Sequence, residues 1–358
     1  MHEKDRVGTG RPRGPGELGP LLGALLVLAL LGLNLGPMET PLGEVLKVLG
    51  QRLSLGYWPG EVDPAVLTVV WDIRLPRILA AMAVGAALAT AGACLQGLFR
   101  NPLADPGLIG VSSGGAIGSI LAIATLGWLP GSGTGLLAIL HVPLWAMTGA
   151  MLTTFIVYRI ARIAGKTHIS TLLLAGIAVN ALAGSLVGAV LYLSDNDALR
   201  RFTFWTLGSL HTAGWQSFFI MLPFIGVPLL ILPHFRTALN AFLLGEAEAY
   251  HLGFNTQLTK RVVVVLCALM VGVTVAFCGL IGFVGLVVPH LVRLLWGPDF
   301  RRLIPASALL GALLVLAADL LARTVNAPAE VPIGVVTSLV GAPFFLYLIH
   351  RRKRQLSV

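Results

Sequence analysis

Long, uninterrupted apolar runs constrain this chain more than any other feature of its sequence. An α-helix of about 20 apolar residues spans the hydrocarbon core of a bilayer, and ten segments approach or reach that length. They cover residues 20–37, 75–98, 108–127, 140–160, 170–193, 214–233, 261–281, 283–296, 303–323 and 333–350. Backbone polar groups inside a bilayer must find their hydrogen bonds within the protein. We therefore expect an all-α, polytopic membrane protein of about ten transmembrane helices.

The composition excludes other classes of protein. Of the 358 residues, 56% are hydrophobic and only 11% are charged, whereas soluble domains carry about 25% charged residues. A disordered chain would need low hydrophobicity. A membrane β-barrel would show alternating segments of about 10 residues, and the apolar runs here are continuous.

The basic residues predict the orientation of the chain. An even number of spans places both termini on the same side. With the termini inside, inner segments hold 18 of the 25 Lys and Arg residues and outer segments hold the other 7. Cytoplasmic loops carry the excess of Lys and Arg, so we expect both termini in the cytoplasm. The net charge of +9 is then a topology signal, and we expect no nucleic-acid partner.

The flanking segments complete the expected domain organisation. Residues 1–19 predict a polar cytoplasmic tail, 20–350 the membrane domain, and 351–358 a basic cytoplasmic tail. Between the first two spans, 38–70 is polar to mixed, and its part 41–55 is amphipathic enough to lie on the membrane interface.

Two stretches rich in Gly and Pro predict irregular backbone at membrane depth, where protein or water must enclose it. They are Asn101–Gly115 and Gly279–Pro289. The eighth span, which overlaps the second stretch, is short enough to be tilted or partly re-entrant.

Few carboxylates lie within the spans. Asp319 is the clearest, and Arg323 follows one helical turn later, which favours a local ion pair. An ion-coupled secondary transporter usually needs ionisable groups in several spans, so this remains a remote alternative. A membrane enzyme would need a metal or nucleophile constellation, and the scattered histidines and three separate cysteines form none.

The sequence also lacks an ATP site of its own. Gly165-Lys166-Thr167 is the one fragment that resembles a phosphate-binding loop, but the Gly required five positions earlier is replaced by Ile160. Any ATPase that drives this protein is therefore expected to be a separate chain.

The inner segment 239–253 is helical in pattern, with apolar residues at 239, 242, 243, 247 and 250 roughly on one face. Gly245 would interrupt the helix, which predicts two short helices joined by a turn, and Gly253 suits a helix C-terminus. Such an element could dock into a groove of a partner or lie on lipid. Glu246 and Glu248 weigh against the lipid, because anionic headgroups repel them.

Several motifs together resemble one protein family. They are Arg74–Arg77 (RLPR), 85–115, 239–253, 279–293 (GLIGFVGLVVPHLVR), Ala317–Arg323 (AADLLAR) and Glu330–Thr337 (EVPIGVVT). Their order and spacing resemble the permease family of bacterial ABC importers for vitamin B12, iron-siderophores and heme, over about residues 65–350.

This resemblance implies a multi-pass permease in the bacterial inner membrane that forms a pore with a second copy of itself. Two ABC ATPase subunits, which carry ATP and Mg, would attach inside, and a periplasmic binding protein would deliver the substrate outside. Transport would proceed by alternating access. The resemblance implies no cofactor or metal on this chain and no chemistry on the substrate.

The resemblance also assigns roles to residues. It implies docking of the binding protein at Arg74, Arg77 and Arg323. It implies coupling to the ATPase at Leu243, Leu244, Gly245, Glu246, Ala247, Tyr250 and Gly253. It implies a cytoplasmic gate at Asn101 and Leu103 and, approximately, at Ser170 and Thr171.

The outer segment 199–210 looks most like the heme-importing branch. Its two arginines could meet the propionates of heme, and its aromatic residues could line a wide path for a porphyrin. The candidate path residues are Arg200, Arg201, Phe202, Phe204, Trp205 and, on another span, Asn180. The alternatives are an interfacial belt of aromatic and Arg residues, or the import of a ferric siderophore or vitamin B12 by the same mechanism. The expected partner outside is then a periplasmic heme-binding protein.

Overall fold

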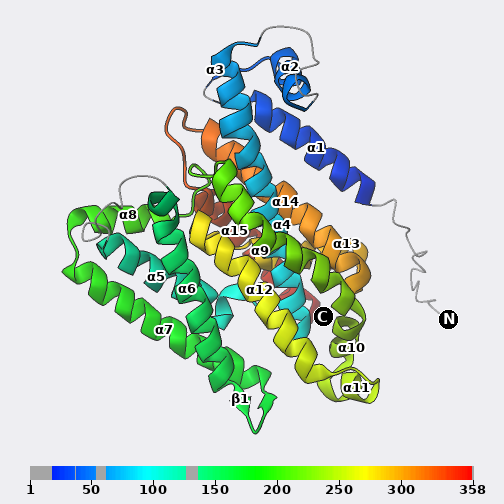
Figure 1. Ribbon diagram of the computed structural model, residues 1–358. Helices are drawn as coiled ribbons and strands as arrows, with labels where there is room; N and C mark the ends of the chain where they lie inside the picture. The colour runs from blue at the N-terminus through cyan, green and yellow to red at the C-terminus, as the bar shows by residue number, and fades with distance from the viewer. Residues whose placement is uncertain (1–17, 37, 54–61, 126–135, 357–358) are drawn as a thin grey trace, which may run out of the picture.

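The computed structural model describes residues 18–36, 38–53, 62–125 and 136–356. Within this part of the chain, six helices are long and apolar enough to cross a membrane and four shorter ones are apolar. Together they confirm an all-helical, polytopic protein of about ten membrane helices (Figure 1). The predicted tail 1–19 lies almost wholly outside the described residues.

The long apolar helices are α3–η2–α4, α6, α7, α9–α10, α12 and α14. Their bounds are Pro64–Leu67, Thr68–Arg74 and Leu75–Leu98 for the first, then Leu136–Ile160 (α6), Ile169–Leu193 (α7), Trp215–Ile231 (α9), Arg236–Leu244 (α10), Thr256–Cys278 (α12) and Phe300–Thr324 (α14). The shorter ones are α1 (Gly19–Asn34), α5 (Val111–Thr125), α13 (Val284–Trp296) and α15 (Ile333–Leu356). The remaining elements are α2 (Leu42–Leu53), α8 (Asn196–Thr206), α11 (Glu246–His251), the turns η3 (Pro106–Ile109) and η5 (Leu232–Phe235), and the strands β1 (Arg162–Ile163) and β2 (Lys166–Thr167).

Helix α4 is the centre of the bundle (Figure 1). Most of its residues are buried, and it contacts α9, α12, α13 and α14. Its sequence is rich in Ala and Gly, which lets neighbouring backbones come close. A Cβ atom added to Gly85 would lie 2.1 Å from the carbonyl oxygen of Gly311, and one added to Gly92 would lie 1.9 Å from that of Gly285. These glycines therefore set the distance between α4 and its neighbours α13 and α14.

The helix that contains the second span begins earlier than its apolar pattern indicates. It starts at Pro64, where the Asp63 side chain accepts a hydrogen bond from the backbone N–H of Ala65 at 2.8 Å, and it runs without a break to Leu98. Asp and Pro are favoured at the start of a helix. The expectation of a mixed, non-spanning stretch over 38–70 was therefore wrong for its last residues. The predicted amphipathic helix over 41–55 is present as α2, which buries Val45 and Val48.

The two Gly- and Pro-rich stretches are irregular over fewer residues than expected. In the first, the loop and the turn η3 end at Gly110, which has a φ of 85°, and α5 starts at Val111. In the second, irregular backbone covers 279–283, and α13 continues through Pro289. The C-terminal tail predicted over 351–358 is helical as far as Leu356.

The predicted inner and outer segments lie at opposite ends of the bundle (Figure 1). The β1–β2 hairpin, α10 and α11 gather at one end, whereas α2 and α3 lie at the other. This arrangement agrees with the assignment of successive loops to the inner and the outer side of the membrane, which the sequence predicted.

We predict that Gly85→Ala destabilises the folded protein by about 1–3 kcal/mol, the usual cost of forcing extra volume into a packed interior. The midpoint of thermal unfolding in detergent should fall. Gly23→Ala is the matched control, because a Cβ atom there meets nothing within 4 Å. Equal midpoints for the two variants would contradict the role of Gly85 in the contact between α4 and α14.

Candidate functional site

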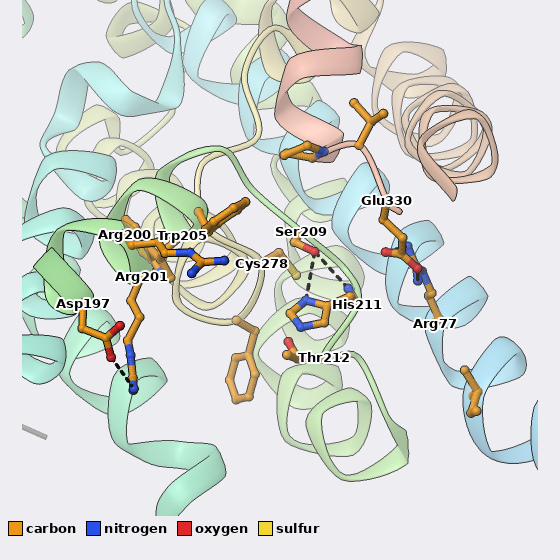
Figure 2. A pocket seen from close by; sticks show the side chains of 16 residues that line it. Arg77, Asp197, Arg200, Arg201, Trp205, Ser209, His211, Thr212, Cys278 and Glu330 are labelled. Carbon is orange, nitrogen blue, oxygen red and sulfur yellow. Dashed lines mark hydrogen bonds and ion pairs between the residues drawn. The ribbon is translucent and has the colours of Figure 1, made fainter. Parts of the chain in front are cut away.

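A cavity of about 810 Å³ opens beside α8 and the turn that follows it (Figure 2). The end of η2, the start of α4, the end of α12 and the segment before α15 supply the rest of its wall. Its polar lining includes Arg77, Asp197, Arg200, Arg201, His211 and Glu330, and its apolar lining includes Ile73, Phe204, Trp205 and Phe277. A mixed wall of cations and aromatic rings suits a large, flat, partly anionic molecule.

Helix α8 arranges its part of this wall through its own periodicity. The Asp195 side chain accepts a hydrogen bond from the backbone N–H of Ala198 at 2.8 Å and so caps the helix start. Residues 197, 200, 201 and 204 then share one face. Arg201 donates a hydrogen bond to Asp197 at 3.1 Å, and the Arg200 guanidinium carbon lies 5.9 Å from the centre of the Phe204 ring.

The structure brings four of the six predicted path residues to this cavity and places two elsewhere. Phe202 does not line it. Its side chain is 6% exposed, stacks on Trp205 and packs against Ile120. This cavity does not support its expected place on the substrate path, because Phe202 lies on the side of α8 that faces the protein interior. Asn180 lines a second cavity of about 480 Å³, where it accepts a hydrogen bond from the Ser113 hydroxyl at 2.6 Å.

Sequence reasoning missed His211, which lies on the turn between α8 and α9 and is exposed to the first cavity. No motif marks it. It sits near the end of the outer segment 199–210, and only the fold of the turn carries it to the cavity wall.

Arg77 is the centre of a buried ion network at the edge of the same cavity. Its Nε donates to Asp319 Oδ1 at 3.0 Å, and its two terminal nitrogens donate to the two oxygens of Glu330 at 2.7 and 3.0 Å. Arg77 is 7% exposed and Asp319 fully buried. The hydrogen bonds from Arg77 hold the pKa of the Glu330 carboxyl below its usual value. The network therefore joins α4, α14 and the segment before α15.

Arg323 and Arg74 bind the end of helix α1. Arg323 donates to the carbonyl oxygen of Gly32 at 2.5 Å, and Arg74 donates to that of Leu33 at 2.6 Å and to the Thr40 hydroxyl at 2.7 Å. The last carbonyls of a helix have no partner within the helix, and cations near that end are favoured. Arg323 also lies 3.8 Å from Asp319, so the predicted pair exists, but Arg77 is the closer partner.

These contacts bear on the docking role expected for the three arginines. All three are less than 10% exposed in the described chain. The three arginines already bind the end of α1, Asp319 or Glu330. To pair with acidic residues of another protein, they would have to give up some of these bonds. The docking assignment stays a prediction.

The segment 239–253 forms the two short helices expected, α10 and α11. Gly245 between them has a φ of 147°, and Gly253 after α11 has a φ of 89°, which favours glycine. The single apolar face that we expected is divided between the two helices. Leu239 and Phe242 are buried in the bundle, because the turn at Gly245 changes the direction of the chain.

Several other apolar residues of the segment face outward. Leu243, Leu244 and Tyr250 are 39%, 68% and 68% exposed, and Ala247 is also exposed. An exposed apolar surface at the end of a membrane bundle is typical of a site for a partner protein.

A buried lysine ties this segment to the neighbouring hairpin. Lys260 on α12 is 1% exposed, and its Nζ donates to Glu246 Oε1 and to the carbonyl oxygen of Thr167, both at 2.6 Å. Gln257 bonds the same two residues. It donates to Glu246 Oε1 at 3.3 Å and accepts from the Thr167 N–H at 2.9 Å. Helices α11 and α12 and strand β2 are therefore held together by polar contacts. In the sequence, Lys260 resembled an ordinary loop cation.

The residues expected at the cytoplasmic gate lie near the end of the bundle that carries the β1–β2 hairpin, α10 and α11. Ser170 and Thr171 form the first turn of α7, directly after the hairpin. In the loop after α4, Asn101 Oδ1 accepts a hydrogen bond from the Leu103 N–H at 2.9 Å, and the Leu103 side chain is 50% exposed. Gly165-Lys166-Thr167 belongs to the hairpin, in which Ile163 pairs with Lys166, so its backbone is not that of a phosphate-binding loop.

We predict that Lys260→Met loosens the contact between α11 and the hairpin, because the Thr167 carbonyl and the Glu246 carboxylate lose their shared donor. Hydrogen exchange at the Thr167 amide should become about tenfold faster, or about 1.4 kcal/mol less protected. Lys166→Met is the control, since Lys166 is exposed in the same hairpin. Equal protection in the two variants would show that Lys260 does not hold these elements together.

Comparison with known proteins gives a consistent result. Residues 24–351 match the FecCD transport family. The chain is 43% identical to a hemin transport system permease of Yersinia pestis, over 95% of this chain and 97% of that protein. It is 41% identical to a vitamin B12 import system permease of Klebsiella pneumoniae, over 92% of each chain.

A solved structure supports the same conclusion. An ABC transporter described as metal-chelate type, in an inward-facing conformation, superimposes with a TM-score of 0.81 at 32% identity, over 94% of this chain and all of that one. The family match covers nearly the whole membrane domain. The chain therefore belongs to the FecCD transport family and is the permease of an ABC importer, a multi-pass transport subunit without an ATPase of its own.

Proposed function

We propose that this permease imports heme, which it receives from a periplasmic heme-binding protein and releases into the cytoplasm by alternating access. The observation that carries this proposal is the outer cavity, whose wall combines Arg200 and Arg201 with Phe204 and Trp205. Aromatic rings give a porphyrin an apolar surface to stack on, and guanidinium groups bind carboxylates such as its propionates. The similarity to the hemin permease of Yersinia pestis supports the same substrate.

The functional assembly that we propose contains two copies of this chain, two ABC ATPase subunits and one binding protein. It lies in the bacterial inner membrane with both termini in the cytoplasm. The pore forms between the two copies. ATP and Mg bind to the ATPases, and heme is the transported substrate.

On the cytoplasmic side, we propose that the exposed surface of α10 and α11 receives the motion of the ATPase. The surface is formed by Leu243, Leu244, Ala247 and Tyr250, which Gly245 and Gly253 position. The Glu246–Lys260–Thr167 contacts then offer a route from α11 to the start of α7, where Ser170 and Thr171 lie. These two residues, with Asn101 and Leu103, would form the cytoplasmic gate.

On the outer side, we propose that the binding protein docks over Arg74, Arg77 and Arg323. Since these side chains are engaged within the chain, docking would proceed by exchange. A carboxylate of the binding protein could compete with Glu330 for Arg77, and Glu330 is the more accessible of the two carboxylates that Arg77 binds. Such an exchange would link docking to the position of the segment before α15.

The substrate is tested by transport into proteoliposomes that contain the permease with its ATPase, with the binding protein added outside. We expect ATP-dependent accumulation of heme that excess vitamin B12 or ferric siderophore does not inhibit. Arg200→Glu should reduce heme uptake, because it places a negative charge where the propionates would bind. Uptake of vitamin B12 or ferric siderophore in place of heme would establish the alternative substrate.

The coupling surface is tested by a charged, bulky side chain at Ala247. We expect Ala247→Glu to uncouple the complex, so that ATP hydrolysis no longer responds to the binding protein and heme uptake falls. Ala247→Ser keeps the side chain small and serves as the control. If Ala247→Glu retains stimulated hydrolysis and transport at the wild-type level, the ATPase does not bind at this surface.

A further inference from the structure

We propose that His211 is an axial ligand for the iron of the porphyrin during its passage through the outer cavity. This inference rests on heme as the substrate and assigns the residue that would hold the metal. His211 stands on a fixed turn, a hydrogen bond orients its imidazole ring, and charged groups share its cavity.

The turn that carries His211 is held in place by backbone hydrogen bonds to two other elements. Ser209 N–H donates to the Cys278 carbonyl at 2.8 Å, and the N–H of Ile333 donates to the Gly208 carbonyl at 3.0 Å. Gly208 itself has a φ of 70° and lies against the backbone of Leu280. The turn is therefore fixed against the end of α12 and the start of α15, and His211 projects from a rigid support (Figure 2).

The imidazole ring is oriented by Ser209. The Ser209 Oγ accepts a hydrogen bond from the backbone N–H of His211 at 3.1 Å and lies 3.1 Å from the Nδ1 atom of the ring. With its proton on Nδ1, the ring donates to the same oxygen, which leaves the lone pair of Nε2 free to bind a metal. Metal-binding histidines usually donate their second ring nitrogen to an oxygen in this way, which sets the tautomer and the ring orientation.

The charges around His211 suit a porphyrin with propionate groups. Arg77 is occupied by Asp319 and Glu330, and Arg201 is paired with Asp197. In the described part of the chain, Arg200 forms no ion pair and lies over the Phe204 ring. It is therefore the cation on this wall most available for a propionate. His211 and Arg200 line the same cavity from different elements. One porphyrin could therefore meet His211 at its central iron and Arg200 at a propionate on its edge.

The chemistry of this site also separates heme from a ferric siderophore. An iron porphyrin has axial positions at which an imidazole can bind, whereas a ferric siderophore surrounds its iron with ligands of its own. The step is a ligand exchange. The Nε2 lone pair forms a bond to iron as water or the previous axial ligand leaves, and the oxidation state does not change. The cavity is open to solvent and His211 is exposed, so water can replace His211 on the iron and the heme can move on.

The test is a spectroscopic titration of the purified permease dimer with hemin and, separately, with metal-free protoporphyrin. We expect wild-type protein to shift the Soret band of hemin in the manner of imidazole ligation. His211→Ala should lose that shift and bind hemin about tenfold more weakly, or about 1.4 kcal/mol. Its affinity for metal-free protoporphyrin should not change, because that molecule offers no iron. His234→Ala, which alters an exposed histidine in η5, should behave as wild type.

The outcomes separate this inference from the proposed substrate. If wild-type protein imports heme and His211→Ala keeps the Soret shift and the affinity, His211 does not bind the iron. Equal weakening for hemin and for metal-free protoporphyrin would also overturn the inference, since it would indicate a packing role. If wild-type protein imports no heme, the proposed substrate fails whatever the titration gives.

Discussion

The close approach of helix α4 to its neighbours is the contact on which the rest of the structure depends. Apolar side chains gain little by leaving lipid for the interior of a helical bundle, so helices associate there through close packing and polar contacts. At Gly85 and Gly92 there is no room for a Cβ atom beside the backbone of α14 and α13. The short distance between α4 and α14 brings Arg77 within hydrogen-bonding distance of Asp319.

At both ends of the bundle, a buried cation joins three different elements. At the outer end, Arg77 joins α4 to α14 and to Glu330. At the inner end, Lys260 joins α12 to α11 and to the hairpin before α7. A buried charge is costly unless it is paired and hydrogen-bonded, so each cation holds its partners in one arrangement. Each also lies beside a surface at which the proposed assembly contacts another protein.

This placement suggests how the proposed transport cycle could use the two networks. Glu330 and Glu246 are partly exposed, at 35% and 39% of their side-chain surface, whereas the cations that they bind are buried. An approaching protein reaches the carboxylates first. Each carboxylate therefore connects an exposed surface to a buried cation that joins several elements.

The sequence by itself determined the class of protein, the approximate number of its spans, and the break at Gly245, because apolar length and glycine are local signals. It also indicated that Arg200, Arg201, Phe204 and Trp205 belong to one outer segment. It did not indicate that Phe202 faces inward, that Asn180 lies in a separate cavity, or that His211 reaches the cavity wall. Neither did it reveal the partners of Arg77 and Lys260. The contacts of Arg77 with Asp319 and Glu330, and of Lys260 with Thr167, join residues that are about 90 to 250 positions apart, and only the packing of helices around α4 decides which distant side chains meet.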